Sequence, residues 1–259
     1  MLYDIPTVVL IGLLLSVTVI TVEAGLRVGK RYGKTTWVNA QAIHTALTAA
    51  TLALTGLMLA FAFNMSAQRF DSRKALITTE ASAIQSVRNR LDFLAPQPRA
   101  KAFSILDQYL KQQIAFLEVG NDPGREQHTI VQARSLHFGL WRIATQSSNY
   151  AAADPQLRAV ELAELTRALM NLDDISRQRE SARAWHVPEA VLFMLFALAI
   201  GSGAVLAYIS GASGHPDRIP TYVVLCLICL VIYLIIDFDR PRRGMMHLDA
   251  GPLRELINR

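Results

Sequence analysis

The chain has few charged residues for its length. Of its 259 residues, 18% are Asp, Glu, Lys or Arg and 52% are hydrophobic, whereas soluble globular chains carry about a quarter charged residues. The deficit is concentrated in four blocks without any charged residue, which are 5–22, 43–63, 190–209 and 220–236. Each block approaches the roughly 20 apolar residues that a helix needs to cross the hydrocarbon of a bilayer. The sequence therefore excludes a soluble protein and predicts an integral membrane protein.

Cysteines and catalytic motifs are scarce as well. The two cysteines, Cys226 and Cys229, both lie in the fourth apolar block, so they cannot form the disulfide framework of an extracellular domain. Their Cys-x-x-Cys spacing lacks a second ligand pair for zinc, and packing as small apolar side chains explains them. The six histidines lie far apart, and no Gly-x-Ser-x-Gly, His-Glu-x-x-His or phosphate-binding glycine loop is present. We expect no enzyme, no metal site and no cofactor.

The apolar blocks predict four transmembrane helices, over 5–22, 43–63, 188–209 and 220–236. Pro188 and Pro220 would occupy first helical turns, where a missing N–H costs nothing. No Lys or Arg precedes the first block, as a secretory signal would require, so we expect a retained anchor. Lys and Arg are more numerous on the side of the two termini than on the other side, which predicts that both termini are cytoplasmic.

The net charge of +5 would suggest nucleic acid as a partner of a soluble protein. Here the basic residues mostly flank the apolar blocks, where anionic lipid headgroups attract them. We therefore expect the partners to include the lipid bilayer and not nucleic acid.

The segment 64–187 is predicted to be a helical bundle in the cytoplasm. Breaks at Pro96 and Pro98, at 121–124 and at 154–155 leave helices near 65–94, 99–119, 125–150 and 156–186. No break separates the second span from the first of these, so one long helix is expected to leave the membrane. The predicted fold class is thus an all-α integral membrane protein, divided into 1–63 (two spans), 64–187 (the bundle), 188–236 (two spans) and 237–259 (a short tail).

Small and polar side chains form a stripe along the second span. At 100° per residue, one line of the helix carries His44, Thr48, Thr51, Thr55, Ala62 and Ser66. Met58 and Leu59 flank this line, whereas the far side carries larger apolar residues such as Leu47 and Leu54. A stripe of this kind is turned away from lipid.

Two interpretations of this polar stripe stay open. Small and hydroxyl residues allow close packing of membrane helices. Alternatively, the stripe lines an ion pore between subunits, with a hydrophobic constriction that gates by dewetting and a basic mouth that concentrates anions. The pore interpretation assigns His44, Thr48, Thr51, Thr55 and Ser66 to the pore lining, Met58, Leu59 and Ala62 to the constriction, and Arg69, Arg73 and Glu80 to the cytoplasmic mouth.

The last two spans carry two further patterns. The third has a small residue at every fourth position, Ala199, Gly203, Ala207 and Gly211, which predicts a face for close helix packing. The fourth ends in Asp237, Asp239 and Arg240. Two carboxylates could hold a cation, but an ion-pair cluster with the adjacent arginines explains them, and no metal is expected there.

Several stretches together resemble an uncharacterised bacterial membrane family described as bestrophin-like. They are 57–63 running into 68–73 (QRFDSR) and 79–84 (TEASAI), then 171–174 (NLDD) leading to Arg183 and Pro188, and finally 237–244 (DFDRPRRG). The resemblance covers nearly the whole chain.

This resemblance implies a channel. Bestrophins are pentameric ion channels with four membrane helices per subunit, cytoplasmic termini and a pore-lining second helix. The chain is therefore expected to form a homo-oligomer, a pentamer, in the bacterial inner membrane and to conduct inorganic ions. The resemblance covers both anion- and cation-selective members, and the basic mouth at Arg69 and Arg73 favours anions over monovalent cations. No run of consecutive acids follows the fourth span to act as a calcium clasp. The alternative is a non-conducting scaffold or signalling protein whose cytoplasmic bundle binds a partner.

Overall fold

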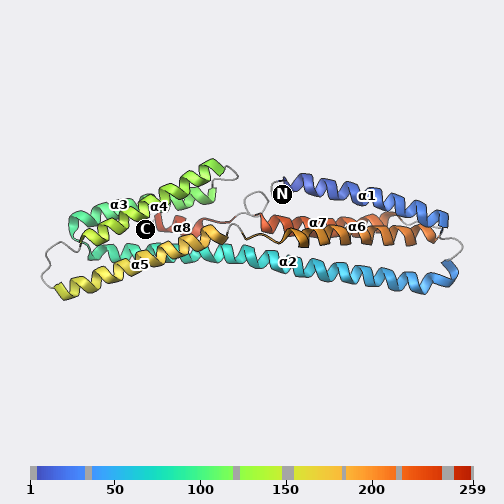
Figure 1. Ribbon diagram of the computed structural model, residues 1–259, viewed down its shortest axis with the longest axis horizontal. Coiled ribbons are helices and arrows are strands. Elements are labelled where there is room, and N and C mark those ends of the chain that lie inside the picture. Colours follow the sequence, from blue (N-terminus) through green and yellow to red (C-terminus); the bar gives the residue numbers. More distant parts are fainter. Residues whose placement is uncertain are drawn as a thin grey trace. The chain divides into compact units, whose positions relative to one another are not determined.

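The computed structural model describes residues 5–32, 37–118, 123–147, 155–182, 185–213, 218–240 and 248–257, and no strand occurs among them. Its elements are α1 (Thr7–Tyr32), α2 (Trp37–Arg90), the 3₁₀ turn η2 (Leu91–Phe93), α3 (Pro96–Glu118), α4 (Pro123–Gln146), α5 (Pro155–Ala182), α6 (Glu189–Ala212), α7 (Arg218–Asp239) and α8 (Gly251–Ile257) (Figure 1). They form two compact units: the membrane unit, Met1–Phe70 with His186–Met246, and the bundle unit, Asp71–Trp185 with His247–Arg259.

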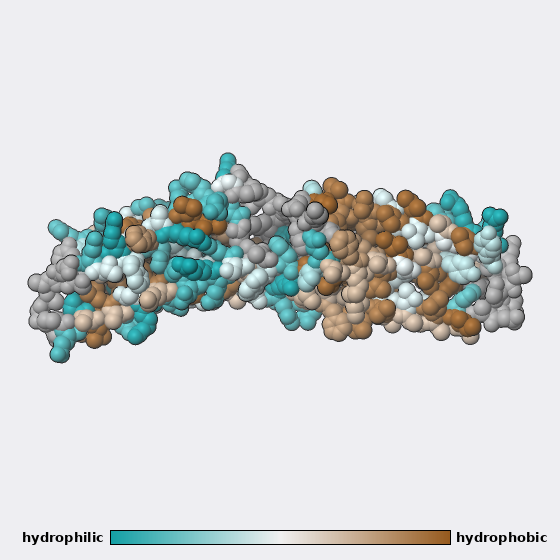
Figure 2. All heavy atoms as spheres, in the orientation of Figure 1, coloured by the Kyte–Doolittle hydropathy of each residue, from teal (hydrophilic) through white to brown (hydrophobic). Residues whose placement is uncertain are grey.

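Four helices are long and apolar enough to span a membrane: α1, α2, α6 and α7. The predicted all-α membrane fold is therefore confirmed. Hydrophobic side chains cover much of the visible surface of these spans, whereas hydrophilic ones prevail over the bundle unit (Figure 2). The first helix continues past the predicted end of its span to Tyr32, because Glu23 finds partners in α7: it accepts hydrogen bonds from Arg218 (3.1 Å) and the Tyr222 hydroxyl (3.0 Å).

The second helix is continuous over 54 residues, which confirms that the second span leaves the membrane as a long helix. No glycine or proline occurs between Leu57 and Leu94 to interrupt it. The next helix, α3, begins at Pro96 rather than at the predicted residue 99. The predicted start lay too far along the chain because proline is tolerated in a first helical turn, where its missing N–H has no helical partner.

The close-packing face predicted on the third span is confirmed. Ala199, Gly203, Ala207 and Gly211 are all buried. A Cβ atom added at Gly25 of α1 would lie 2.9 Å from the Ala207 Cβ atom, and one added at Gly211 would overlap the carbonyl oxygen of Leu26. Glycine on both helices therefore allows the backbones of α1 and α6 to touch.

We expect Gly211→Ala to destabilise the membrane unit by about 1–3 kcal/mol, because the added methyl overpacks the contact with α1. The matched control is Gly201→Ala on the same helix, since nothing lies within 4 Å of a Cβ atom at Gly201. Thermal unfolding in detergent, followed by circular dichroism, measures both. Equal midpoints for the two variants would contradict the described α1–α6 contact.

The bundle unit has its own apolar core. Its buried side chains come from every helix of the unit and include Ile77, Ile84 and Val87 of α2, Leu106 and Leu110 of α3, Leu140 of α4, Leu165, Leu169 and Leu172 of α5, and Leu253 of α8. The short helix α8 is fixed further by Arg88, which donates to the Leu256 carbonyl (2.6 Å). The C-terminal helix is thus an integral part of the bundle unit.

Candidate functional site

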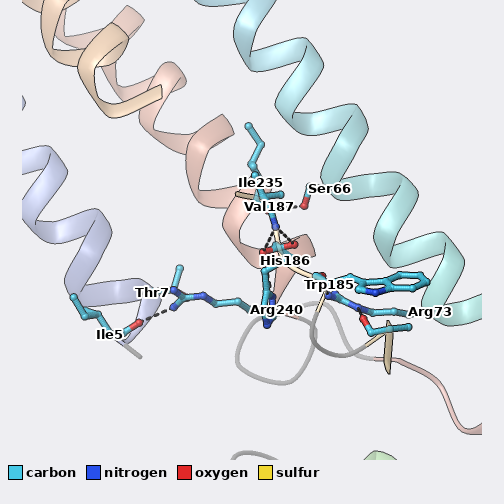
Figure 3. Close-up of polar contacts among 11 residues, drawn as sticks. Ile5, Thr7, Ser66, Arg73, Trp185, His186, Val187, Ile235 and Arg240 are labelled. Atoms are coloured by element: carbon cyan, nitrogen blue, oxygen red, sulfur yellow. Dashed lines mark hydrogen bonds and ion pairs between the residues drawn. The ribbon is translucent and has the colours of Figure 1, made fainter. Parts of the chain in front are cut away.

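The polar stripe of α2 packs against other helices of the same chain. The Thr55 side chain is 2% exposed, and its hydroxyl shares a 2.7 Å hydrogen bond with the hydroxyl of Ser202 on α6. The Ser66 hydroxyl, fully buried, donates to the Ile235 carbonyl of α7 (2.7 Å; Figure 3). At the other end of the stripe, the His44 ring meets the edge of Tyr208 of α6 at 6.0 Å between ring centroids. The stripe therefore joins α2 to α6 and α7.

The pore lining at Thr55 and Ser66 stays a prediction, although both side chains are buried within their own chain. His44, Thr48 and Thr51 are half-buried along the same line. Thr48 and Thr51 donate to the carbonyls of His44 (2.9 Å) and Leu47 (2.7 Å), one turn back on α2. Their hydroxyls are thus satisfied by their own helix.

The predicted constriction lies inside the membrane unit. Leu59 and Ala62 belong to the buried core of this unit, and Met58 packs against that core. A constriction at Met58, Leu59 and Ala62 stays a prediction, while Leu59 and Ala62 are buried by side chains of their own chain. A polar stripe with small neighbours identifies the face turned from lipid, and here intrachain helices occupy that face.

Two members of the predicted cytoplasmic mouth are buried in the bundle unit. The Arg73 guanidinium donates from Nε to the carbonyl of Ala182 (3.2 Å) and from Nη2 to that of Trp185. Arg73 therefore holds the end of α5 on α2. Its assignment to a basic mouth stays a prediction, and Arg69 is half-buried and keeps some exposed surface.

Glu80 is the centre of a buried ionic network. Its carboxylate lies 2.6 Å from Nη1 of Arg179 on α5 and accepts a hydrogen bond from the Tyr109 hydroxyl of α3 (3.4 Å). Arg179 also donates to the side-chain oxygen of Gln113 and lies over the Phe116 ring at 4.7 Å. Burial raises the pKa of the Glu80 carboxyl, an effect that the Arg179 charge opposes. The assignment of Glu80 to a pore mouth stays a prediction, while the contacts described here join three helices in the interior of the bundle unit.

The sequence did contain a signal for this network. Glu80 lies on an α2 stripe of core residues with Ile77, Ile84 and Val87, and Arg179 continues the leucine stripe of α5 by two turns. A charged residue on an apolar stripe needs an opposite charge nearby, because an unpaired buried charge is costly. Matching the two stripes would have paired Glu80 with Arg179.

The end of α7 is tied to the start of α6 and to the N-terminal segment. Asp239 accepts the Val187 backbone N–H at 3.1 Å on both carboxylate oxygens and lies 3.4 Å from Nδ1 of His186. Arg240 donates to the Ile5 carbonyl (2.6 Å; Figure 3). Asp237 is also buried. A mutual ion-pair cluster of Asp237, Asp239 and Arg240 stays a prediction, while these contacts give Asp239 and Arg240 a role in joining helix ends.

Removing the Asp239 carboxylate is expected to remove both oxygens that accept the buried Val187 N–H. We expect Asp239→Leu to cost about 1–3 kcal/mol of unfolding free energy, measured as a lower midpoint in thermal unfolding. Asp239→Asn keeps one acceptor oxygen and should lose less unfolding free energy than Asp239→Leu. Equal losses for the two variants would show that the hydrogen bond to Val187 does not carry the effect.

The side of α2 away from the polar stripe has little cover from the residues that the structure describes. Only 17% of the residues in its most apolar stretch are buried, compared with 39% in α7. One strip of this side, called the free face here, carries exposed small residues at helical spacing, namely Ala46, Ala49, Ala53, Gly56 and Ala60. The strip beside it carries exposed larger apolar residues such as Leu47 and Leu54. A Cβ atom at Gly56 would have nothing within 4 Å, so packing within the chain does not explain its small size.

Comparison with known families settles the membership of the chain. The model of the Bestrophin-like domain family matches residues 12–253. The chain belongs to this family. The resemblance inferred from the stretches at 57–84, 171–188 and 237–244 is thereby confirmed. No curated protein and no solved structure matches the bestrophin-like chain.

Proposed function

We propose that this bestrophin-like chain forms a homo-oligomeric ion channel in which the free face of α2 borders the ion pathway. The burial pattern of α2 carries the proposal. Thr55 and Ser66 of its polar stripe bond to α6 and α7, whereas the free face presents alanine and glycine that are exposed among the described residues. A single free face cannot enclose a pathway, so several copies of α2 must surround it.

Small apolar side chains suit this position for a physical reason. A ring of helices approaches its axis most closely where the inward side chains are short, and such a ring can gate by dewetting. The constriction is therefore proposed at Ala53, Gly56 and Ala60 instead of at Leu59 and Ala62. The larger apolar residues beside this face, such as Leu57 and Phe61, are also exposed and would contact lipid or the neighbouring subunit.

Ring size, orientation and ion preference complete the proposal. Membership of the family supports a pentamer in a bacterial inner membrane, and the distribution of Lys and Arg supports cytoplasmic termini. A preference for anions is the last part of the proposal. Neither stripe arginine supports it at the free face, because Arg73 is engaged with the carbonyls of Ala182 and Trp185 and Arg69 lies on the polar-stripe side of α2.

Ion flux from liposomes tests whether the protein conducts. The purified full chain is reconstituted into potassium chloride-loaded liposomes, and halide and potassium efflux are followed separately after dilution. We expect efflux that scales with the protein-to-lipid ratio. Liposomes holding an unrelated four-span protein at the same ratio are the control, and efflux no faster than theirs from an assembled oligomer would contradict the proposal.

A non-conducting scaffold is the second candidate, and exposed apolar side chains of the bundle unit favour it. Val131 and Phe138 of α4 are 55% and 65% exposed, and Val160 of α5 is 60% exposed. Exposed apolar residues of this size suit a protein partner when they form one patch. A scaffold predicts an assembled oligomer that carries no current and a bundle unit that binds a partner through these residues.

A further inference from the structure

A groove of about 640 Å³ lies in the bundle unit between α2 and α5. This volume falls within the range of pockets that bind small molecules. Its walls combine apolar, hydroxyl, amide and charged side chains, namely Ser72, Ala75, Leu76 and Thr79 of α2, Asp174, Arg177, Gln178 and Ser181 of α5, and Trp185. None of these residues belongs to the proposed ion pathway.

Several polar groups of this α2–α5 groove are not used by the fold. In the part of the chain that the structure describes, the side chains of Asp174, Gln178 and Ser181 make no hydrogen bond or ion pair. The Arg177 guanidinium, by contrast, donates to the Asp173 carboxylate at 2.7 Å, so its charge is already balanced. The Asp174 carboxylate thus lines the groove without a hydrogen-bond donor, and its charge interacts with that of Arg177.

The aromatic wall of the groove is Trp185, whose backbone is fixed by hydrogen bonds. Trp185 is 53% exposed, yet its backbone is fixed, because its carbonyl accepts a hydrogen bond from the buried guanidinium of Arg73 and its N–H donates to the Ala182 carbonyl (3.4 Å). An indole that is exposed but anchored presents a binding surface without the entropy cost of ordering the chain.

We propose that the α2–α5 groove binds a small organic cation, an alkylammonium group. A carboxylate that has no hydrogen-bond donor and an aromatic face are the two features that recognise such a group, the first by charge and the second by cation–π attraction. Ala75 and Leu76 supply apolar surface for the alkyl substituents, and the free Gln178 amide and Ser181 hydroxyl can bond a polar substituent. An anion would meet the Asp174 carboxylate instead. The cation could be a free metabolite or the ammonium headgroup of a lipid.

The fluorescence of Trp185 can report binding in the groove. The full chain is placed in nanodiscs of phosphatidylglycerol, which carries no amine, with Trp37 and Trp141 replaced by Phe so that Trp185 is the remaining tryptophan. Choline is titrated at constant ionic strength, and 3,3-dimethylbutanol serves as its neutral isostere. We expect saturable quenching of Trp185 by choline and at least tenfold weaker binding of the alcohol.

Two variants assign the site. Asp174→Asn should weaken choline binding at least fivefold, whereas Asp92→Asn, which removes an exposed carboxylate elsewhere in the bundle unit, should leave it unchanged. Equal binding of choline and its neutral isostere, no saturable binding, or an unaltered Asp174→Asn variant would each overturn the proposal.

Nanodiscs that contain phosphatidylethanolamine distinguish the source of the cation. Weaker apparent choline affinity in these discs identifies a lipid headgroup as the occupant, and unchanged affinity identifies a free cation. Because the readout is binding, the result is independent of whether the protein conducts.

Discussion

Glu80→Leu is expected to destabilise the bundle unit by about 3–5 kcal/mol, because it leaves the Arg179 charge buried without its counter-charge. The two side chains lie 2.6 Å apart and are 0% and 6% exposed, so water cannot compensate for the lost carboxylate. Denaturant unfolding of the full chain, followed by the fluorescence of Trp141 beside the bundle core, measures the loss.

The double variant Glu80→Leu with Arg179→Met is the matched control. It removes both charges and keeps apolar volume, and such replacements of buried ion pairs are often neutral or stabilising. We therefore expect the double variant to recover most of the stability that the single variant loses. A loss below about 1 kcal/mol in Glu80→Leu, as an exposed pair would give, would contradict the burial of this network.

Charged thiol reagents should block the current of an Ala53→Cys channel and leave a Thr55→Cys channel unaffected. The expected block is large, because a bulky cation attached at the free face of α2 in every subunit would fill a narrow pathway. Thr55 is two residues away on the same helix, but its side chain is buried against Ser202, so a cysteine there should not react.

This comparison needs a background without reactive native thiols. Cys226 is exposed on α7 and Cys229 is buried, so both are replaced by Ser and Ala respectively before the scan. Reagent is applied during recording, and the current before and after is compared. Block at Thr55→Cys without block at Ala53→Cys would restore the polar stripe as the pore lining and contradict the proposed free face.

The membrane fold was predictable because its signals are local. Absence of charge locates a span wherever it occurs, and uninterrupted helix formers after Phe63 predict the long α2 helix. The packing face of α6 could be predicted for the same reason, since Gly203 and Gly211 at helical spacing have few other uses in a membrane helix. The predicted helix ends were less accurate. The first helix continues past Val22 because Glu23 bonds to Arg218, which is distant in sequence and could not be matched to it from the sequence.

The direction of the α2 stripe could not be predicted, because periodicity shows which face avoids lipid and not what covers it. Thr55 and Ser66 would be spaced identically in a pore and in a helix interface. Only the positions of Ser202 and Ile235 distinguish the two. Trp185 gave no sequence signal either, since its role in the groove depends on Arg73 from another helix.

The reversal potential of the purified protein in a planar bilayer under a tenfold potassium chloride gradient tests the central proposal most directly. The account predicts a steady current that reverses near the chloride equilibrium potential, and a reversal near that of potassium would keep the channel but overturn the preference for anions. Absence of any current from a well-formed oligomer, under conditions in which a known channel conducts, would contradict the proposed function.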